Sequence, residues 1–322
     1  MASSMNLAVV IVTYKRQQLL QVLFDSLVAL QVPPAHIVVV DNEASKETEQ
    51  LTCDLAARLA HTEVHYHPME KNVGGAGGFS VGVEIAMQIG AEWIWVMDDD
   101  VKVLPEATAR LAPWLADGVA NDTRVIQVGR RDVNGNDFYW QSHFNTTFGV
   151  PNPLSPAGFR PGERSRVIDT MCFEGGIVHR SIVDTIGLPD ARFFIYWDDT
   201  IYGYLASKYT KPILLDERLI QRTRVLQNLR IGRIRRLNET SDMNRYYIMR
   251  NRGYMAQYFK LYGDYKPILF GVGTLMTLGK EIIRLRLADD FRHGLRQLLD
   301  GVRDSGPLRR DKTWRSMSAM SR

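Results

Sequence analysis

The sequence has few cysteines, the residues that form disulfides and bind structural zinc. It contains two cysteines, Cys53 and Cys172, which lie far apart and have no metal-ligand spacing. We therefore expect neither a disulfide framework nor a structural zinc site, and this composition suits a reducing cytoplasm. No basic segment precedes the first apolar run in MASSMNLAVVIVTYKR, and no cleavage-like site follows it. This run is expected to be a first strand and not a signal peptide.

Long apolar stretches are also missing. The longest one near the C-terminus, PILFGVGTLMTLG, is too short to cross a bilayer unaided. A spanning helix is therefore not expected, whereas a segment lying on a membrane surface is compatible with this length. With 322 residues, of which 45% are hydrophobic and 24% charged, the chain can form one large α/β domain with an extension.

Negative charge is scarce in the last third of the chain. Residues 222–322 hold 22 Lys and Arg but nine Asp and Glu, whereas residues 1–221 hold 18 and 27. A basic end of this kind indicates contact with an anionic surface, either a membrane or nucleic acid. We expect a membrane, because the rest of the chain is acidic and no nucleic-acid recognition motif is present. The protein is then cytoplasmic and peripheral at the inner face of the cell membrane, with headgroups bound by Arg224, Arg230, Arg233, Arg235 and Arg236.

Apolar runs alternate with helical patterns over the first hundred residues. Runs rich in β-branched residues, such as LAVVIVTY and HIVVVDN, are typical of parallel strands buried on both faces. Amphipathic segments such as QQLLQVLFDSLVALQ separate them. This alternation predicts an α/β fold with a doubly wound, mostly parallel sheet. Ligands of such sheets bind at the carboxyl ends of the strands, where Tyr14, Asp41 and Asp98 lie.

The pattern changes after about residue 130. Residues 129–166 are rich in Gly, Pro and Asn, and we expect an irregular insertion with short strands and a hairpin turn at NGN. VIDTMCFEGGIVHR returns to the sheet, and WDDTIYGYLASKY starts a helix. From about residue 222 the chain is expected to be helical and basic. The expected domains are therefore residues 1–221, which bind the ligand, and a membrane-associating region at 222–322.

Two acidic clusters are the main candidates for chemistry. In EWIWVMDDDV, Asp98 and Asp100 can both reach a hard divalent cation such as Mg²⁺ or Mn²⁺, which prefers oxygen ligands. An acidic turn that caps a strand is the alternative. In FFIYWDDTIYG, Asp198 and Asp199 are candidates for a general base, although a helix N-cap with a first-turn acid explains them equally well.

A glycine-dense segment, NVGGAGGFSVG, is expected to form a loop that opens a helix at Phe79. Glycines at 74, 75, 77 and 78 allow close backbone approach and expose N–H groups to an anion. The segment has no Gly-Lys-Ser/Thr and follows the third strand, so neither a Walker A loop nor a Rossmann dinucleotide site is indicated.

These motifs, in this order, resemble the GT-A glycosyltransferases of family 2. The similarity is carried by VVIVTYKR, VVVDN, NVGGAGGF, WVMDDDV, FEGGIVHR and FFIYWDD, and RYYIMRNRGY extends it to about residue 255. Within the family the chain is most similar to bacterial galactofuranosyltransferases of the short type, with rhamnosyltransferases as relatives. The resemblance implies a GT-A fold, Rossmann-like, followed here by a basic helical C-terminal extension.

The resemblance also implies roles for residues at the matching positions. Asp98 and Asp100 would form the metal-binding D-x-D motif, and Asp199 would be the catalytic base, with Asp198 beside it. The nucleotide-sugar donor would be bordered by Thr13, Arg16, Asp41, Asp99, Gly74, Gly75, Gly77 and Gly78. Gly175, Gly176 and Trp197 would contact the acceptor.

One departure concerns the metal. The larger galactofuranosyltransferases place a metal-binding histidine about two dozen residues after the base, where this sequence has Gln221. A neutral amide or a water would then complete the coordination, or the metal would be held more weakly. The chain also lacks the extra modules of the polymerising enzymes, so we expect it to add one or a few sugars.

The expected function is therefore inverting, metal-dependent transfer of a sugar, galactofuranose from UDP-galactofuranose, to a glycolipid or polysaccharide hydroxyl. The alternatives are a rhamnosyltransferase that uses a dTDP sugar and a non-catalytic nucleotide-sugar-binding protein. Histidines offer no competing site, because His65 and His67 alternate on a short strand and His179 has no acidic neighbour in the sequence. We expect structural roles for all three.

Overall fold

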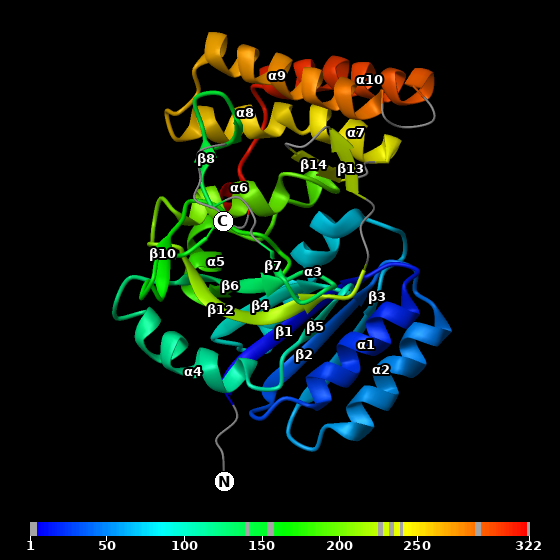
Figure 1. Cartoon of the computed structure of the whole chain (residues 1–322), viewed down its shortest axis with the longest axis vertical. Coiled ribbons are helices and arrows are strands. Elements are labelled where there is room, and N and C mark those ends of the chain that lie inside the picture. Colours follow the sequence, from blue (N-terminus) through cyan, green and yellow to red (C-terminus); the bar gives the residue numbers. More distant parts are fainter. Residues whose placement is uncertain are drawn as a thin grey trace.

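A mixed β-sheet of ten strands forms the centre of the molecule (Figure 1). The computed structural model describes residues 5–138, 142–152, 158–224, 228–231, 235–238, 241–286 and 291–320. The main path of the sheet runs β10-β12-β6-β11-β4-β1-β2-β3, with β5 and β7 paired to β12 and β6. The strands are β1 (Met5–Thr13), β2 (Pro34–Asp41), β3 (Glu63–Pro68), β4 (Trp93–Asp98), β5 (Val101–Val103), β6 (Val125–Arg131), β7 (Asp137–Phe138), β10 (Ser165–Val167), β11 (Gly176–His179) and β12 (Ile213–Arg222).

Strand β1 shows why the first half folds as the sequence predicts. It pairs in parallel with β2 and β4, and β2 pairs in parallel with β3. Successive side chains of a strand point to opposite faces. Leu7, Val9 and Ile11 accordingly pack with α1 (Gln17–Val28) and α2 (Lys46–Arg58). Ala8 and Val10 pack on the other face with α3 (Gly74–Gln88). The predicted α/β fold with a mostly parallel sheet is confirmed.

Helix α3 begins earlier than the sequence analysis expected. The glycines at 74–78 are not a loop before Phe79 but the first turns of the helix. A Cβ on Gly78 would lie 2.5 Å from Val12 Cγ1, and one on Gly82 would lie 2.3 Å from Val10 Cγ1. These glycines therefore allow α3 to approach β1 closely, which offsets their low helix propensity.

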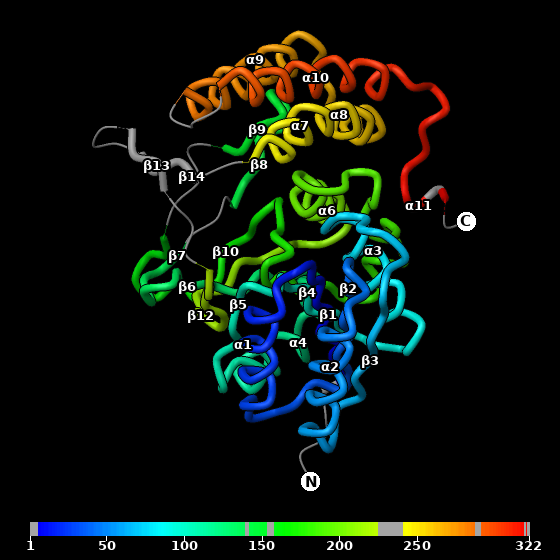
Figure 2. The backbone as a smooth tube through the Cα atoms, turned by 90° about the vertical axis from the view of Figure 1, so that its right-hand side faces the viewer, coloured from blue at the N-terminus to red at the C-terminus, as the bar shows by residue number. Residues whose placement is uncertain are grey.

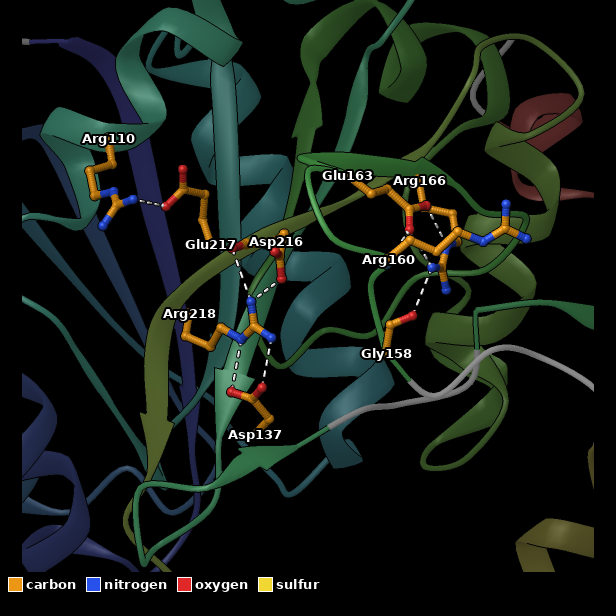
Figure 3. Close-up of polar contacts among 9 residues, drawn as sticks. All are labelled: Arg110, Asp137, Gly158, Arg160, Glu163, Arg166, Asp216, Glu217 and Arg218. Carbon is orange, nitrogen blue, oxygen red and sulfur yellow. Dashed lines mark hydrogen bonds and ion pairs between the residues drawn. The ribbon is translucent and has the colours of Figure 1, made fainter.

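The expected insertion is present and is tied to the sheet by ion pairs. β6 and β7 form a hairpin around Asp132–Asn136, which confirms the turn at NGN. Arg218 of β12 contacts Asp137 at 2.7 Å and also pairs with Asp216 (Figure 3). Farther along, Arg166 binds Glu163 and the carbonyl oxygen of Gly158. The remaining insertion strands are β8 (Phe144–Asn145) and β9 (Val150–Pro151).

The C-terminal part is not helical from residue 222 as expected. Two short strands, β13 (Asn228–Ile231) and β14 (Arg235–Asn238), form an antiparallel pair before the first helix of this region. The four helices that follow, α7 (Asp242–Arg250), α8 (Arg252–Leu261), α9 (Pro267–Leu285) and α10 (Phe291–Arg310), stack beyond α6, on the side of the molecule opposite the N-terminus (Figure 2). The chain then returns toward α5 and ends in α11 (Met317–Met320).

One hydrophobic core continues from the sheet into these helices. Met255 and Phe259 of α8 belong to the same buried cluster as Val10 of β1 and Phe79 of α3. The cluster also includes residues of α5 (Arg180–Ile186) and α6 (Asp198–Ala206). Helix α4 (Ala107–Gly118) instead packs on the other face of the sheet, together with α1. The division at residues 221 and 222 falls at the end of β12 and stays a prediction. Among the described residues, no helix is both long and apolar enough to span a bilayer.

Candidate active site

Several polar side chains converge at the carboxyl edge of the sheet. β1, β4, β6 and β12 run in the same direction, and β11 runs against β4 and β6. The ends of the four strands and the start of β11 therefore lie at one edge, where open α/β sheets bind ligands. The polar residues at this edge are Thr13, Asp98, Asp99, Asp100, Arg130, Glu174 and Arg222.

The three consecutive acids at the end of β4 have different environments. Asp99 is 2% exposed, and its carboxylate accepts hydrogen bonds from Thr13 Oγ1 at 2.8 Å and Arg16 Nη1 at 3.0 Å. Asp100 lies 3.5 Å from the same guanidinium and is 19% exposed. Asp98 is partly exposed as the last residue of β4. Asp99 thus holds Arg16 and the β1 end in place, which leaves Asp98 and Asp100 to face a ligand.

Asp98 and Asp100 are poorly stabilised as anions. Burial raises the pKa of both carboxyls, and negative charge on Glu174 raises them further. Repulsion from Asp100 adds to the effect at Asp98, while Arg16 opposes it at both. A divalent cation would relieve this repulsion, and an all-oxygen donor set suits Mg²⁺ or Mn²⁺. The residues present therefore fit the metal that the resemblance implies.

Glu174 is a buried acid that is already paired. It is 4% exposed, and its carboxylate binds Arg222 through two hydrogen bonds of 2.7 and 2.5 Å. Arg130 lies 3.5 Å away. Both cations lower its pKa, which burial alone would raise. Glu174 is thus an anion held in a fixed position, and its negative charge acts on Asp98 and Asp100.

The second acidic cluster is connected to the first through buried side chains. Arg130 Nη1 donates to Cys172 Sγ at 3.3 Å, and both side chains lower the pKa of Asp199. Arg130 also lies 3.5 Å from Glu174, whose charge raises the pKa of Asp100, so the same buried groups act on Asp199 and on the end of β4. The two acidic clusters therefore share one region of the molecule.

Asp198 and Asp199 titrate differently although they are adjacent. Burial and the negative charge of Asp199 raise the pKa of Asp198 to about 8. Burial also raises the pKa of Asp199, but Thr200, Cys172 and Arg130 oppose this shift. The Thr200 N–H donates to Asp199 Oδ1 at 2.5 Å. Asp198 is therefore mostly protonated at neutral pH, whereas Thr200, Cys172 and Arg130 each favour the anionic form of Asp199.

The backbone before this pair is strained. Phe194, Tyr196 and Trp197 have φ values of 64°, 70° and 71°, in the left-handed region that side chains disfavour. Asn251 holds this segment: its Nδ2 lies 2.8 Å from the carbonyl oxygens of Phe193 and Ile195 and 3.0 Å from that of Tyr196. Asn251 is 0% exposed and connects α7 to α8. The C-terminal helices therefore set the position of Asp198 and Asp199.

Helix α3 contacts the strained segment from the other side. The Ala76 N–H donates to the carbonyl oxygen of Phe194 at 3.0 Å. A Cβ on Gly74, whose φ is +74°, would lie 2.1 Å from that oxygen. At Gly77 a Cβ would meet Val73 at 2.6 Å, whereas Gly75 has no neighbour within 4 Å. In this structure Gly74, Gly77 and Gly78 serve packing, and Gly75 is the one of the four with open space beside it.

Other residues expected near ligands are engaged within the protein. Asp41 is 0% exposed and accepts from the N–H groups of Glu43 and Ser45 and from the Tyr66 hydroxyl. Its carboxylate forms the strand-end turn and does not face the open edge. The Trp197 indole donates to the Ile248 carbonyl oxygen at 3.0 Å. Its ring packs edge-on against Phe144.

The two glycines expected at the acceptor are buried in the sheet. A Cβ on Gly175, whose φ is +95°, would lie 2.5 Å from Ile220 Cδ1, and one on Gly176 would lie 2.4 Å from Met171 Cε. Their role in this structure is to allow the turn into β11. Gln221 donates to the Val133 carbonyl oxygen at 3.3 Å, so its amide does not face the acids. Because side chains alternate along β12, Arg222 is the residue that does.

The sequence motifs did not point to Arg130, Arg222, Cys172, Glu174 or Asn251. Glu174 had a signal, since it is an acid in FEGG directly before a strand that returns to the sheet. Arg130 and Cys172 are 42 residues apart, and no local pattern links them. Asn251 lies within RYYIMRNRGY, whose similarity was noted without a role for any one side chain.

Comparisons with known proteins agree with this architecture. The model of the family described as glycosyl transferase family 2 matches residues 8–187. Galactofuranosyltransferase GlfT1 of Mycolicibacterium smegmatis is 26% identical over 269 residues, covering 76% of this chain and 81% of that protein. Among solved structures, S. aureus TarS 1-349 in complex with UDP has a TM-score of 0.54 at 14% identity, covering 97% of this chain and 93% of that one. GalNAc-T7 with UDP, GalNAc and Mn²⁺ has a TM-score of 0.52 at 18% identity, covering 69% and 44%.

Proposed function

Since the chain belongs to glycosyl transferase family 2 and is a glycosyltransferase with the GT-A fold, we propose that it transfers galactofuranose from UDP-galactofuranose. The acceptor is a hydroxyl group of a lipid-linked or cell-surface glycan, and the transfer inverts the anomeric centre. The observation that carries the proposal is the convergence of two acidic clusters at one edge of the sheet, joined through Glu174, Arg130 and Cys172.

Asp199 acts as the general base. It accepts the proton of the acceptor hydroxyl as that oxygen forms a bond to the anomeric carbon. The bond from this carbon to the diphosphate oxygen breaks on the opposite face, and its electron pair leaves with UDP. A base positioned in this way contributes about 10²–10⁴-fold to the rate. Hydrogen bonds from Thr200 keep Asp199 oriented, and Thr200 and Cys172 both favour its anionic form.

Asp98 and Asp100 would hold Mn²⁺ or Mg²⁺. When bound, the cation neutralises charge on the departing diphosphate. Arg16 lies beside these acids with 40% of its side chain exposed, so its guanidinium can bind the diphosphate as well. The proposed donor also borders Thr13 and Gly75. Asp99 and Asp41 support this surface from beneath, because both are buried and hydrogen-bonded within the protein.

The proposed acceptor is membrane-bound, and helix α9 supports a peripheral position at an anionic bilayer. Its exposed side chains include Ile268, Leu275 and Met276, which are 83%, 69% and 57% exposed. Val272 and Ile283 extend the same helical stripe. Exposed cations are present at both ends of α9, at Lys266 and Arg286, and α10 carries the exposed Arg292 and Arg296. An apolar stripe with basic flanks is typical of helices that lie in the membrane interface.

This surface differs from the arginines that the sequence analysis favoured. Arg224 is exposed, as a headgroup contact requires. Arg230, Arg235 and Arg236 lie in β13 and β14, whose backbone alone is described. Arg233 lies outside the described residues. The α9 stripe therefore carries the membrane proposal.

The test is a donor screen with the purified protein and Mn²⁺. UDP-galactofuranose, UDP-galactopyranose, dTDP-rhamnose and a GDP sugar are each supplied with a polyprenyl-linked glycan acceptor, and both nucleotide release and glycan mass are measured. We expect product from UDP-galactofuranose alone. Product from dTDP-rhamnose would establish the rhamnosyltransferase instead. Binding of UDP without turnover of any sugar would indicate a non-catalytic binder, and calorimetry with unchanged UDP affinity after Mn²⁺ removal would contradict the metal assignment.

A further inference from the structure

A second group of metal-ligating side chains lies far from the carboxyl edge. Among the residues that the structure describes, the group consists of His36, Glu63 and His65. One ligand atom of each lies within 4.8 Å of the other two. His36 lies near the start of β2, and Glu63 is the first residue of β3. The group therefore occupies the amino end of strands whose carboxyl ends point toward the proposed active site.

The parallel register of β2 and β3 places these side chains together. His36 pairs with Glu63 across the two strands, and His65 follows Glu63 by two residues. Residues two apart in a strand share one face, and diagonal neighbours on adjacent strands are within reach of long side chains. β3 is the last strand of the main sheet path (Figure 1), so the group sits at a sheet edge that is open to solvent.

The separations of the three ligand atoms match a metal site. His36 Nδ1 lies 3.4 Å from Glu63 Oε2, His65 Nε2 lies 3.8 Å from the same oxygen, and the two nitrogens are 3.5 Å apart. The point equidistant from three atoms so spaced is about 2.1 Å from each, which is the length of zinc bonds to imidazole nitrogen and carboxylate oxygen. No rearrangement of the three atoms is needed to surround an ion.

We propose that His36, Glu63 and His65 bind one Zn²⁺-class transition-metal ion that clamps the edge strand β3 to β2, with water in the remaining position. Two imidazoles and one carboxylate suit zinc and its neighbours, whereas Mg²⁺ and Mn²⁺ prefer the oxygen ligands of Asp98 and Asp100. The side chain of Glu63 is 74% exposed and that of His65 is 30% exposed, so an ion can enter from solvent. Cysteine spacing in the sequence does not indicate this zinc site, because its ligands are brought together by the register of two strands.

The experiment uses untagged, full-length protein stripped with a chelator and moved into chelator-free buffer. Titration calorimetry measures the affinity for Zn²⁺ of the unaltered protein, of Glu63→Gln and of His65→Ala. His67→Ala is the matched control. His67 lies on the same strand and face as His65 but outside the group. Loss of an outer-shell partner already weakens metal binding by about 10–100-fold, so loss of a ligand should cost at least about 100-fold. His67→Ala should bind one ion per chain as the unaltered protein does.

Two further measurements separate this site from the acidic one. Zn²⁺ should raise the thermal midpoint of the unaltered protein by a few degrees and leave that of Glu63→Gln unchanged, while any rise with Mg²⁺ should be the same in the two proteins. Asp100→Asn should retain the zinc-dependent rise. Absence of zinc binding by the unaltered protein, or equal binding by Glu63→Gln and His65→Ala, would overturn the proposal and leave the transferase proposal untouched. Loss of the rise in Asp100→Asn would assign the ion to the acidic cluster instead.

Discussion

At the scale of single residues, environment separates side chains that look alike in the sequence. Asp98, Asp99 and Asp100 are chemically identical, yet Asp99 is buried against Thr13 and Arg16 while its neighbours stay partly exposed. The sequence predicted the position of this cluster because strand ends meet at one edge of a parallel sheet. It did not predict the division of roles, because that depends on Arg16 and Glu174, which come from other parts of the chain.

Asp198 and Asp199 should respond differently to the same substitution. Asp198→Asn should retain transfer within a few-fold near pH 7, because its pKa of about 8 already keeps that side chain mostly neutral. Asp199→Asn should lower kcat/KM by about 10²–10⁴-fold, because the base is lost. Steady-state kinetics with UDP-galactofuranose measures both, and UDP affinity by calorimetry should be unchanged in each. Equal loss in the two variants would show that the neutral and anionic roles are assigned wrongly.

The same pair predicts a pH dependence of stability. A carboxyl with a pKa raised from 3.8 to about 8 binds its proton more tightly in the folded state. Its contribution to the free energy of unfolding is therefore largest below the unfolded pKa and falls as pH rises through the folded pKa. Asp198→Asn removes this term, so its thermal midpoint should decline less than that of the unaltered protein between pH 5 and 8. A parallel decline in both proteins would contradict the raised pKa.

At the scale of secondary-structure elements, the starts and ends of helices were the weakest part of the sequence analysis. Apolar strands such as β1 and β4 were predictable because continuous burial demands continuous apolar sequence. The start of α3 was not, because glycine disfavours helix and the compensating contacts with Val12 and Phe194 lie in other segments. β13 was missed as well, although Leu229 and Ile231 alternate with polar residues as a strand requires.

Adjacent glycines in α3 provide a matched pair. Gly74→Ala should reduce the free energy of unfolding by about 1–3 kcal/mol, because the methyl group meets the Phe194 carbonyl and the backbone has a positive φ. Gly75→Ala should be neutral or stabilising by up to about 1 kcal/mol, because nothing lies within 4 Å and alanine favours helix. Urea denaturation distinguishes the two. Equal destabilisation would indicate that Gly75 is also crowded.

Asn251 is a positioning residue for the strained segment at 194–197. Asn251→Ala leaves the carbonyl oxygens of Phe193, Ile195 and Tyr196 without their shared donor. Transfer should fall at least about tenfold through kcat, while the donor KM and UDP affinity change less than about twofold. The unfolding free energy should fall by about 1–3 kcal/mol. Asn121→Ala, in an exposed turn, is the control and should match the unaltered protein. A loss confined to stability would limit Asn251 to a structural role.

At the scale of the whole molecule, the charge asymmetry of the sequence corresponds to a spatial one. The basic helices α9 and α10 lie on the side opposite the N-terminus, beyond α6 (Figure 2). Composition predicted a basic end but not an apolar stripe, because PILFGVGTLMTLG reads equally well as a buried helix. Packing decides the matter, since Phe270, Gly273 and Thr277 face inward and the stripe faces out.

Membrane attachment should depend on the stripe. The double substitution Leu275→Glu with Met276→Glu should lower flotation with liposomes containing anionic lipid by at least about tenfold, because two apolar contacts are replaced by two repelled charges. Transfer to a water-soluble acceptor should be unchanged. Val167→Glu is the matched control, since Val167 on β10 is 56% exposed and Met276 57%. Equal flotation of all three proteins would remove α9 from the membrane proposal.

The buried amide between α7 and α8 has a practical corollary for engineering. A fragment trimmed after β12 would retain every acidic ligand and the base, yet it would lose the one side chain that bridges the three carbonyl oxygens before α6. Truncated variants and chimaeras should therefore end beyond α8. Exchange of the helical segment between relatives would then transfer the residue that positions the proposed base together with the proposed membrane surface.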